Sequence, residues 1–317
     1  MVIVVEHEAS AVVMTVGAAR VRTWRVALSV NEVWQLHRRW SLVATRTADH
    51  LDRWRSRNLA LVLLGALFAA LASQSQWFSQ TVTVVLGAIG AATLALAGVI
   101  QARLLTADRI RARVATRAVS EALKGIVYQY LAGVEPFGGV DRNVTLVEKT
   151  NEVERLSADY ALLLSGVAPD IIEVPQVKGV ADYVRLRAEE QRDWHDQRTA
   201  KHREQAHSWR AAELIATAAA AVLAAVGGAW HGSNLSSWVA VATTAVTAFA
   251  AHLAGQQHER IADSYGRTVV SLNAALRSFD ADRATEEEAA AFVANVEQVL
   301  AAQNETWVGL FSVRPSS

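Results

Sequence analysis

The sequence predicts an all-α integral membrane protein in which four transmembrane helices form two hairpins and long helices extend into a cytoplasmic helical bundle. Three observations predict this class. The chain has 317 residues and is 52% hydrophobic, with a mean hydropathy of +0.16. Charged residues are almost absent from four apolar segments, which come in two pairs, each joined by a short polar turn. The chain contains only 4 Pro, so long helices can continue unbroken.

Composition excludes several classes of function. The formal net charge is +0, so the chain lacks the basic excess of nucleic-acid-binding proteins, and we expect no nucleic-acid partner. The absence of Cys excludes disulfide frameworks, thiolate metal sites and Cys nucleophiles. No nucleotide-binding, zinc-protease or serine-hydrolase motif occurs, so we expect no catalytic residue, no cofactor and no metal. The first residues lack the features of a secretory signal.

The first half of the chain, residues 29–166, is predicted to be one two-transmembrane helical module. An N-terminal arm, residues 1–28, precedes it and is expected to form short strands or to be disordered. Ser29 and Glu32 have the spacing of a capping box, which predicts the start of an Arg-rich helix. The predicted transmembrane segments of this module are residues 59–73 and 81–101.

The second half, residues 177–311, repeats the same plan and is followed by a short tail, residues 312–317. A charged, Trp-containing helix leads directly into an apolar run. That run, residues 211–230, has the ~20 residues that a helix needs to cross a bilayer. The second run, residues 238–254, is nearer the lower limit. A hairpin buried inside a soluble bundle is the alternative interpretation of both modules.

Charge placement predicts the topology. Both turns lack Lys and Arg, whereas all four opposite helix ends carry Arg. The positive-inside rule therefore places both turns outside and both termini in the cytoplasm. Aromatic residues expected at the outer interface are Trp77, Trp230 and Trp238.

Diffuse helical signatures over about residues 30–311 resemble the SLATT superfamily, the SMODS- and SLOG-associating two-transmembrane effector domains. In the second half the likeness lies in the segment from Tyr183 to Gln191 and in residues that lead into the hairpin, which are Trp194, His202, Trp209 and Arg210. It also lies in residues after the hairpin, which are Ser264, Tyr265, Val296, Glu297 and Asn304 to Trp307. This half is similar to a branch known only as a bacterial domain of unknown function.

The first half resembles a second SLATT type through residues 117–124, Tyr128, Tyr130 and the loop from Gly133 to Phe137, where Tyr is the commoner residue at the Phe137 position. Tandem modules of this kind imply a membrane effector that has been proposed to form pores in bacterial defence. The implied location is the bacterial cytoplasmic membrane.

Ionisable and hydroxyl residues in the apolar helices are the pore-lining candidates. Glu213 and His252 lie near the cytoplasmic ends of the second hairpin, and we hypothesise that they face each other or a vestibule between subunits; snorkelling to the interface is the alternative. Thr243 and Thr247 share one helix face, and Thr217 is a further candidate. Ordinary helix packing is the alternative role for these hydroxyls. The first hairpin is expected to face lipid.

Five residues of the charged helix before the second hairpin are candidates for coupling cytoplasmic packing to helix tilt: Arg185, Gln191, Trp194, Trp209 and Arg210. A solvated helix face is the simpler interpretation of this helix. We also expect His195 and His202, two helical turns apart, to lie on that solvated face, and His258 to lie on the surface.

The function that these features favour is an oligomeric, channel-like membrane effector gated through its cytoplasmic helices. Its expected partners are the lipid bilayer, other copies of the chain and a soluble signalling partner that the sequence does not identify. The alternative is a non-conducting membrane anchor that recruits soluble proteins. A transporter is a weaker alternative because no broken helix marks a binding site, and an enzyme is not expected.

Overall fold

The structure, a computed structural model, describes residues 28–74, 76–168, 171–229 and 235–311, with side chains described up to residue 305. All regular elements in these ranges are helical, which confirms the predicted all-α class. The helices are α1 (Val30–Ala72), α2 (Gln80–Leu104), α3 (Ala107–Ala132), α4 (Arg142–Leu156), a 3-10 helix (Ala158–Leu164), α5 (Val180–Tyr183), a π-helix (Val184–Glu189), α6 (Glu190–Ala229), α7 (Leu235–Gln256), α8 (His258–Arg277) and α9 (Glu286–Phe311).

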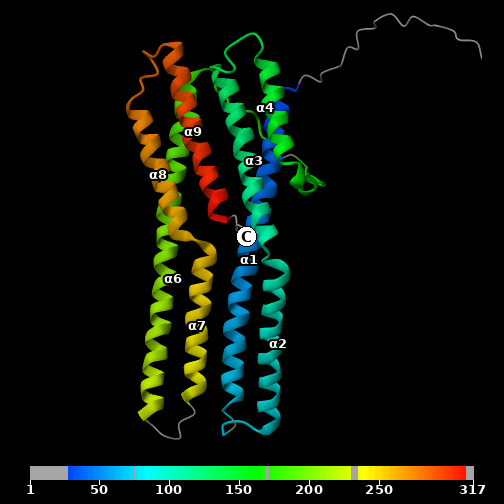
Figure 1. Cartoon of the computed structure of the whole chain (residues 1–317), viewed down its shortest axis with the longest axis vertical. Helices are drawn as coiled ribbons and strands as arrows, with labels where there is room; N and C mark the ends of the chain where they lie inside the picture. The colour runs from blue at the N-terminus through cyan, green and yellow to red at the C-terminus, as the bar shows by residue number, and fades with distance from the viewer. Residues whose placement is uncertain (1–27, 75, 169–170, 230–234, 312–317) are drawn as a thin grey trace, which may run out of the picture.

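Four of these helices are long and apolar enough to cross a membrane. In Figure 1 their apolar parts stand side by side in the lower half of the molecule, in the order α6, α7, α1 and α2. Helices α6 and α7 form one hairpin, α1 and α2 form the other, and α1 packs on α7 between them. The two hairpins therefore make a row with α2 and α6 at its ends, and the other helices gather above it.

Two helices run without interruption from this row into the helical bundle. Helix α1 extends over 43 residues and begins at the predicted capping box, in which Ser29 and Glu32 exchange hydrogen bonds. Helix α6 extends over 40 residues and continues the π-helix that precedes it. Both helices therefore connect the bundle to the membrane segments without a break.

Small residues bring the two helices of the first hairpin close together. A Cβ atom built on Gly65 would lie 2.6 Å from Leu94 Cγ, and one built on Gly90 would lie 3.1 Å from the backbone nitrogen of Ala69. At the tips, Gln74 Nε2 donates a hydrogen bond of 2.9 Å to Ser237 Oγ of the second hairpin. Small residues therefore stabilise the first hairpin, and a tip contact ties the two hairpins together.

The bundle has a core that joins both halves of the chain. Trp40 of α1, Leu123 of α3, Leu272 of α8 and Val296 of α9 are among its fully buried side chains. These four helices come from both predicted modules, so the parts of the modules outside the apolar row share one hydrophobic core rather than forming two separate cores.

Some expectations fall partly or wholly outside the described residues. These include the N-terminal arm up to residue 27, Trp230 and the tail at residues 312–317. After the Gly133–Phe137 loop come α4 and a short 3-10 helix, with Ser157 between them.

Candidate functional site: two cavities that meet at His252

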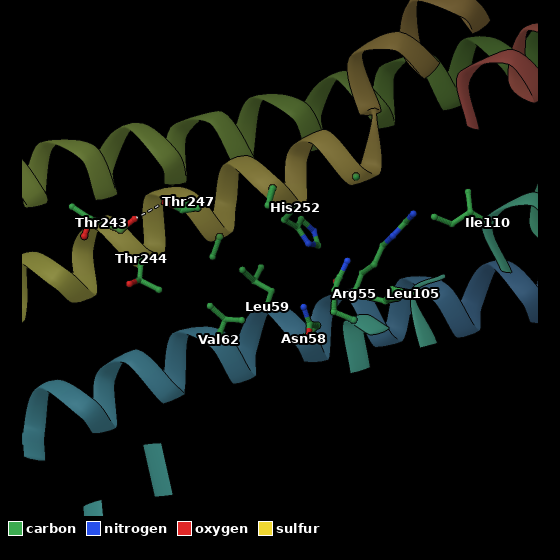
Figure 2. Close-up of a pocket in the computed structure, with 14 residues that line it drawn as sticks. Arg55, Asn58, Leu59, Val62, Leu105, Ile110, Thr243, Thr244, Thr247 and His252 are labelled. Atoms are coloured by element: carbon green, nitrogen blue, oxygen red, sulfur yellow. Dashed lines mark hydrogen bonds between the residues drawn. The ribbon is translucent and has the colours of Figure 1, made fainter. Parts of the chain in front are cut away.

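A cavity of about 600 Å³ lies between the two hairpins, at the ends of the apolar segments that face the bundle. We call it the hairpin cavity. Figure 2 shows α7 on one side and α1 on the other, with Leu59 and Val62 of α1 opposite the threonines of α7. Leu105, which directly follows α2, and Ile110 of α3 close the end nearest the bundle. Because α1 supplies part of this lining, the first hairpin is not only the lipid-facing scaffold that we expected.

The bundle-side end of the hairpin cavity contains polar atoms without hydrogen-bond partners. Arg55 Nη1 and Asn58 Oδ1 are buried and make no hydrogen bond. Asp52 is the acidic neighbour of Arg55, but its Oδ1 atom lies 3.7 Å from Arg55 Nη1 and 2.9 Å from Arg113 Nη1. Asp52 therefore pairs mainly with Arg113, and the guanidinium of Arg55 remains poorly compensated.

Two of the three threonines predicted to line a pathway, Thr243 and Thr247, lie in this cavity. Thr243, Thr244 and Thr247 all contribute to its wall. Their hydroxyls donate hydrogen bonds to carbonyls of α7 itself, such as Thr247 Oγ1 to the Thr243 carbonyl at 3.1 Å. The hydroxyl oxygens keep acceptor capacity toward the cavity, because each uses its proton within the helix.

Glu213 and His252, which we hypothesised to face each other or a vestibule between subunits, have different surroundings within one chain. The ring of His252 packs against Trp209 at a centroid distance of 4.4 Å and lines the cavity. Neither Glu213 nor Thr217 is among the residues that line the described cavities. Thr217 instead donates a hydrogen bond to the carbonyl of Glu213 on the same helix. The structure thus brings His252 to the cavity and leaves the other two residues on α6 away from it.

A second cavity, of about 710 Å³, lies inside the bundle directly above the first. We call it the bundle cavity. Both cavities are lined by His252, so they meet at this residue. The charged lining of the bundle cavity consists of Arg113, Arg117, Lys124, Arg198, Lys201, Asp49, Asp52 and Glu121. Five cations against three acids make the cavity basic, although the whole chain has a formal net charge of +0.

Histidines line the bundle cavity, which corrects our expectation that they lie on a solvated face or on the surface. His195 is 2% exposed and His258 is 7% exposed. His202 Nδ1 and His258 Nδ1 lie 2.9 Å apart, so one ring donates and the other accepts. Burial, together with the neighbouring His258, lowers the pKa of His202 to about 4. The expectation was wrong because the face of α6 that carries His195, Thr199 and His202 packs against α8, whereas charged neighbours such as Arg203 and Glu204 remain exposed.

The same histidine pair holds the joint between α7 and α8. Gln257 separates the two helices and has a φ of 51°, the left-handed region that residues other than Gly rarely adopt. His258 opens α8 and contacts His202 of α6. The next residue, Glu259, accepts a hydrogen bond of 2.5 Å from Arg210. Two side-chain contacts from α6 therefore hold the first turn of α8 just after the joint.

The predicted coupling residues divide into two groups. Gln191, Trp194 and Trp209 line the bundle cavity, and the ring of Trp194 packs against Tyr265 of α8 at 5.5 Å. Arg210 holds the joint as described above, whereas Arg185 is largely exposed and pairs with Asp182 at 3.0 Å. Four of the five candidates thus contact the cavity or the joint.

Sequence reasoning did not single out the buried ion pair at the centre of the bundle. Arg187 of the π-helix is 1% exposed and donates to both carboxylate oxygens of Glu297, at 2.9 and 3.0 Å. Tyr183 donates to the same carboxylate at 2.8 Å. Burial alone disfavours the charged guanidinium, but the carboxylate of Glu297 raises the pKa of Arg187 above its ordinary value. These three residues lie in segments that carried the family resemblance, which was the available signal.

Comparison with family models supports the family resemblance seen in the sequence. Residues 183–307 match the model of SMODS and SLOG-associating 2TM effector domain 1. Residues 38–144 match the model of a family described as a protein of unknown function, DUF4231. A SLATT domain next to a module of unknown function is therefore confirmed, with the latter in the first half rather than the second. No curated protein and no solved structure matches the chain.

Proposed function

We propose that this chain, which carries a SLATT two-transmembrane effector domain in residues 183–307, is an oligomeric pore-forming membrane effector gated through its cytoplasmic helices. The observation that carries the proposal is the junction at His252, where the basic bundle cavity meets the threonine-lined hairpin cavity. A basic cavity in the bundle that meets a threonine-lined cavity between membrane segments supports a gated pathway through both.

The order of helices in the row supports assembly of several copies. Inside one chain, the first helix of one hairpin, α1, packs on the second helix of the other, α7. This head-to-tail pairing leaves the first helix α6 and the second helix α2 at the two ends of the row. Pairing α6 of one copy with α2 of the next would repeat the same kind of contact, and heterologous contacts of this kind generate rings when the rotation closes.

Exposed side chains at both ends of the row agree with such a contact. Val84 and Val85 of α2 are 64% and 50% exposed, and Leu214 and Val222 of α6 are 70% and 62% exposed. A stripe of small residues along α6, comprising Ala218, Ala221, Ala225 and Gly228, is also exposed. Such a stripe allows close approach of a neighbouring helix in lipid.

Gating in this proposal acts through the joint at Gln257. A signal that changes the packing of α8 against α6 would tilt α7 relative to the bundle, because Arg210 and His202 hold the first turn of α8. A partner or ligand drives this change only if it binds the two arrangements with different affinity.

Release of a dye from liposomes tests the function directly. If the full chain forms a pore, it should release a small dye from the liposomes into which it is reconstituted. The same chain should run as an oligomer in mild detergent. Retention of the dye together with retention of soluble proteins in a pull-down would favour the membrane-anchor alternative. We further propose that the chain acts without catalysis and without nucleic acid, with both termini in the cytoplasm.

Cysteine accessibility tests which residues line the pathway, because the natural chain has no Cys. A charged thiol reagent should modify Thr243→Cys and Thr247→Cys and reduce dye release. Val84→Cys is the matched control, because it is exposed on the outer helix α2 and is expected to face lipid or a neighbouring copy. Modification of Val84→Cys with no reaction at Thr243→Cys or Thr247→Cys would contradict the proposed lining.

A further inference from the structure

The hairpin cavity has two chemically different ends. Its bundle-side end carries the polar side chains Arg55, Asn58, Gln101 and His252. Further along the row its lining becomes apolar or hydroxyl-bearing, through Leu59, Val62, Ala248 and the threonines of α7. Figure 2 shows Arg55, Asn58 and His252 toward the bundle side of the gap, where Leu105 and Ile110 close it, and Val62 and the threonines of α7 farther along. A cavity with a polar mouth and an apolar interior matches an amphiphilic molecule rather than a water-soluble one.

The polar end lies at the depth of a lipid headgroup. Arg55 is one helical turn before Leu59, the first residue of the predicted membrane segment of α1. His252 stands opposite, near the end of the apolar part of α7. A cation at the membrane boundary, between transmembrane helices, attracts anionic lipid headgroups in the adjacent leaflet.

Unsatisfied polar atoms at this end point to a missing partner. Arg55 Nη1 needs an acceptor and Asn58 Oδ1 needs a donor, yet neither makes a hydrogen bond although both atoms are buried. Asp52 does not satisfy Arg55, because it pairs more closely with Arg113. Unmade hydrogen bonds at buried atoms are costly. A phosphodiester supplies the acceptor for Arg55, and a headgroup hydroxyl supplies the donor for Asn58.

We propose that the hairpin cavity binds one anionic glycerophospholipid with a hydroxyl-bearing headgroup, taken from the leaflet next to the helical bundle. The phosphate contacts Arg55, the headgroup hydroxyl contacts Asn58, and an acyl chain lies along Leu59, Val62 and the facing part of α7. The bound lipid thereby occupies the gap between the hairpins in place of water.

This inference does not require that the chain conducts. A lipid in this position fills the gap that Thr243 and Thr247 line, so it has to move when a pathway opens there. Lipid binding and dye release are therefore separate measurements, and the loss of one does not imply the loss of the other.

Native mass spectrometry of the full chain in detergent tests the proposal. The chain is incubated with equal amounts of phosphatidylglycerol and phosphatidylcholine. We expect one phosphatidylglycerol per chain to be retained in preference to phosphatidylcholine. Arg55→Gln should lower this retention about fivefold. Arg57→Gln removes the same charge from an exposed position two residues away and should leave retention unchanged.

A second variant and a competition experiment complete the test. Ala248→Leu leaves every charge in place but fills part of the apolar wall, so it should also lower phosphatidylglycerol retention, even if Arg55→Gln fails to fold. Soluble glycerol phosphate should not compete for the site, because it lacks the acyl chain. Equal retention of both lipids, unchanged retention in Arg55→Gln, or full competition by glycerol phosphate would each overturn the proposal.

Discussion

Arg187 shows how a single residue joins the two halves of the bundle. Its guanidinium pairs with Glu297 of α9 and lies 3.8 Å from Glu121 of α3. Gly125 of α3 leaves room for this pair, because a Cβ atom there would lie 2.7 Å from a carboxylate oxygen of Glu297. The pair therefore fixes how α3, α9 and the start of the long α6 segment meet.

Removing one partner of this pair should destabilise the bundle strongly. Arg187→Gln leaves the Glu297 carboxylate buried without its cation, a change that typically costs about 3–5 kcal/mol. Arg185→Gln, two residues away on an exposed side chain, should have little effect. Denaturant unfolding followed by tryptophan fluorescence in detergent measures both. If the two variants lost equal stability, the pair would not hold the helices together.

The buried histidines should make the bundle sensitive to mild acid. Burial lowers the pKa of His37 to about 4, although its ring donates a hydrogen bond of 2.8 Å to the Ser120 carbonyl. The unfolded chain binds this proton near the ordinary pKa of ~6.5, so the stability contributed by neutral His37 is complete above that pH. It decreases as the pH falls from ~6.5 through about 4.

We therefore expect the free energy of unfolding to fall by about 2 kcal/mol per such histidine between pH 7 and pH 5. His37→Gln keeps a side-chain donor but cannot titrate, so its melting midpoint should fall less over this pH interval. His207→Gln changes an exposed histidine and should behave like the natural chain. A natural chain that melts at the same temperature at both pH values would contradict this reasoning.

Among the elements, the first hairpin depends on two glycines at the crossing of α1 and α2. Gly90→Leu should destabilise this hairpin by about 1–3 kcal/mol, the usual range for overpacking, because its Cβ would press on the Ala69 backbone. Gly98→Leu is the matched control on the same helix, since nothing lies within 4 Å of a Cβ at Gly98. Thermal melting in detergent compares them, and equal midpoints would show that the close approach is not needed.

The helices themselves were largely predictable from the sequence because their signals are local. The capping boxes at Ser29 and Thr285 both form, and the four apolar helices follow from composition and length. The cavities were not predictable, because each is lined by residues from both halves of the chain. The burial of His195 and the pairing of Arg187 with Glu297 depend on helices that are distant in sequence. The spacing of apolar residues along a single helix does not predict such contacts.

For the whole molecule, the row of four helices leads to a prediction about assembly. If α6 of one copy meets α2 of the next, residues at equal depth on these helices should come close between copies. Val84 of α2 and Val226 of α6 are both exposed and each lies within about one turn of the hairpin end of its helix. They lie on helices at opposite ends of the row within one chain.

A chain that carries both Val84→Cys and Val226→Cys should therefore form cross-links between copies in the membrane, giving a ladder of products that ends at the size of a closed ring. Either single substitution should give no ladder, because the head-to-tail contact pairs unlike helices. Gel electrophoresis without reductant reads the products. A dimer from Val84→Cys alone would indicate a two-fold contact between α2 helices instead, and the ring arrangement would then be excluded.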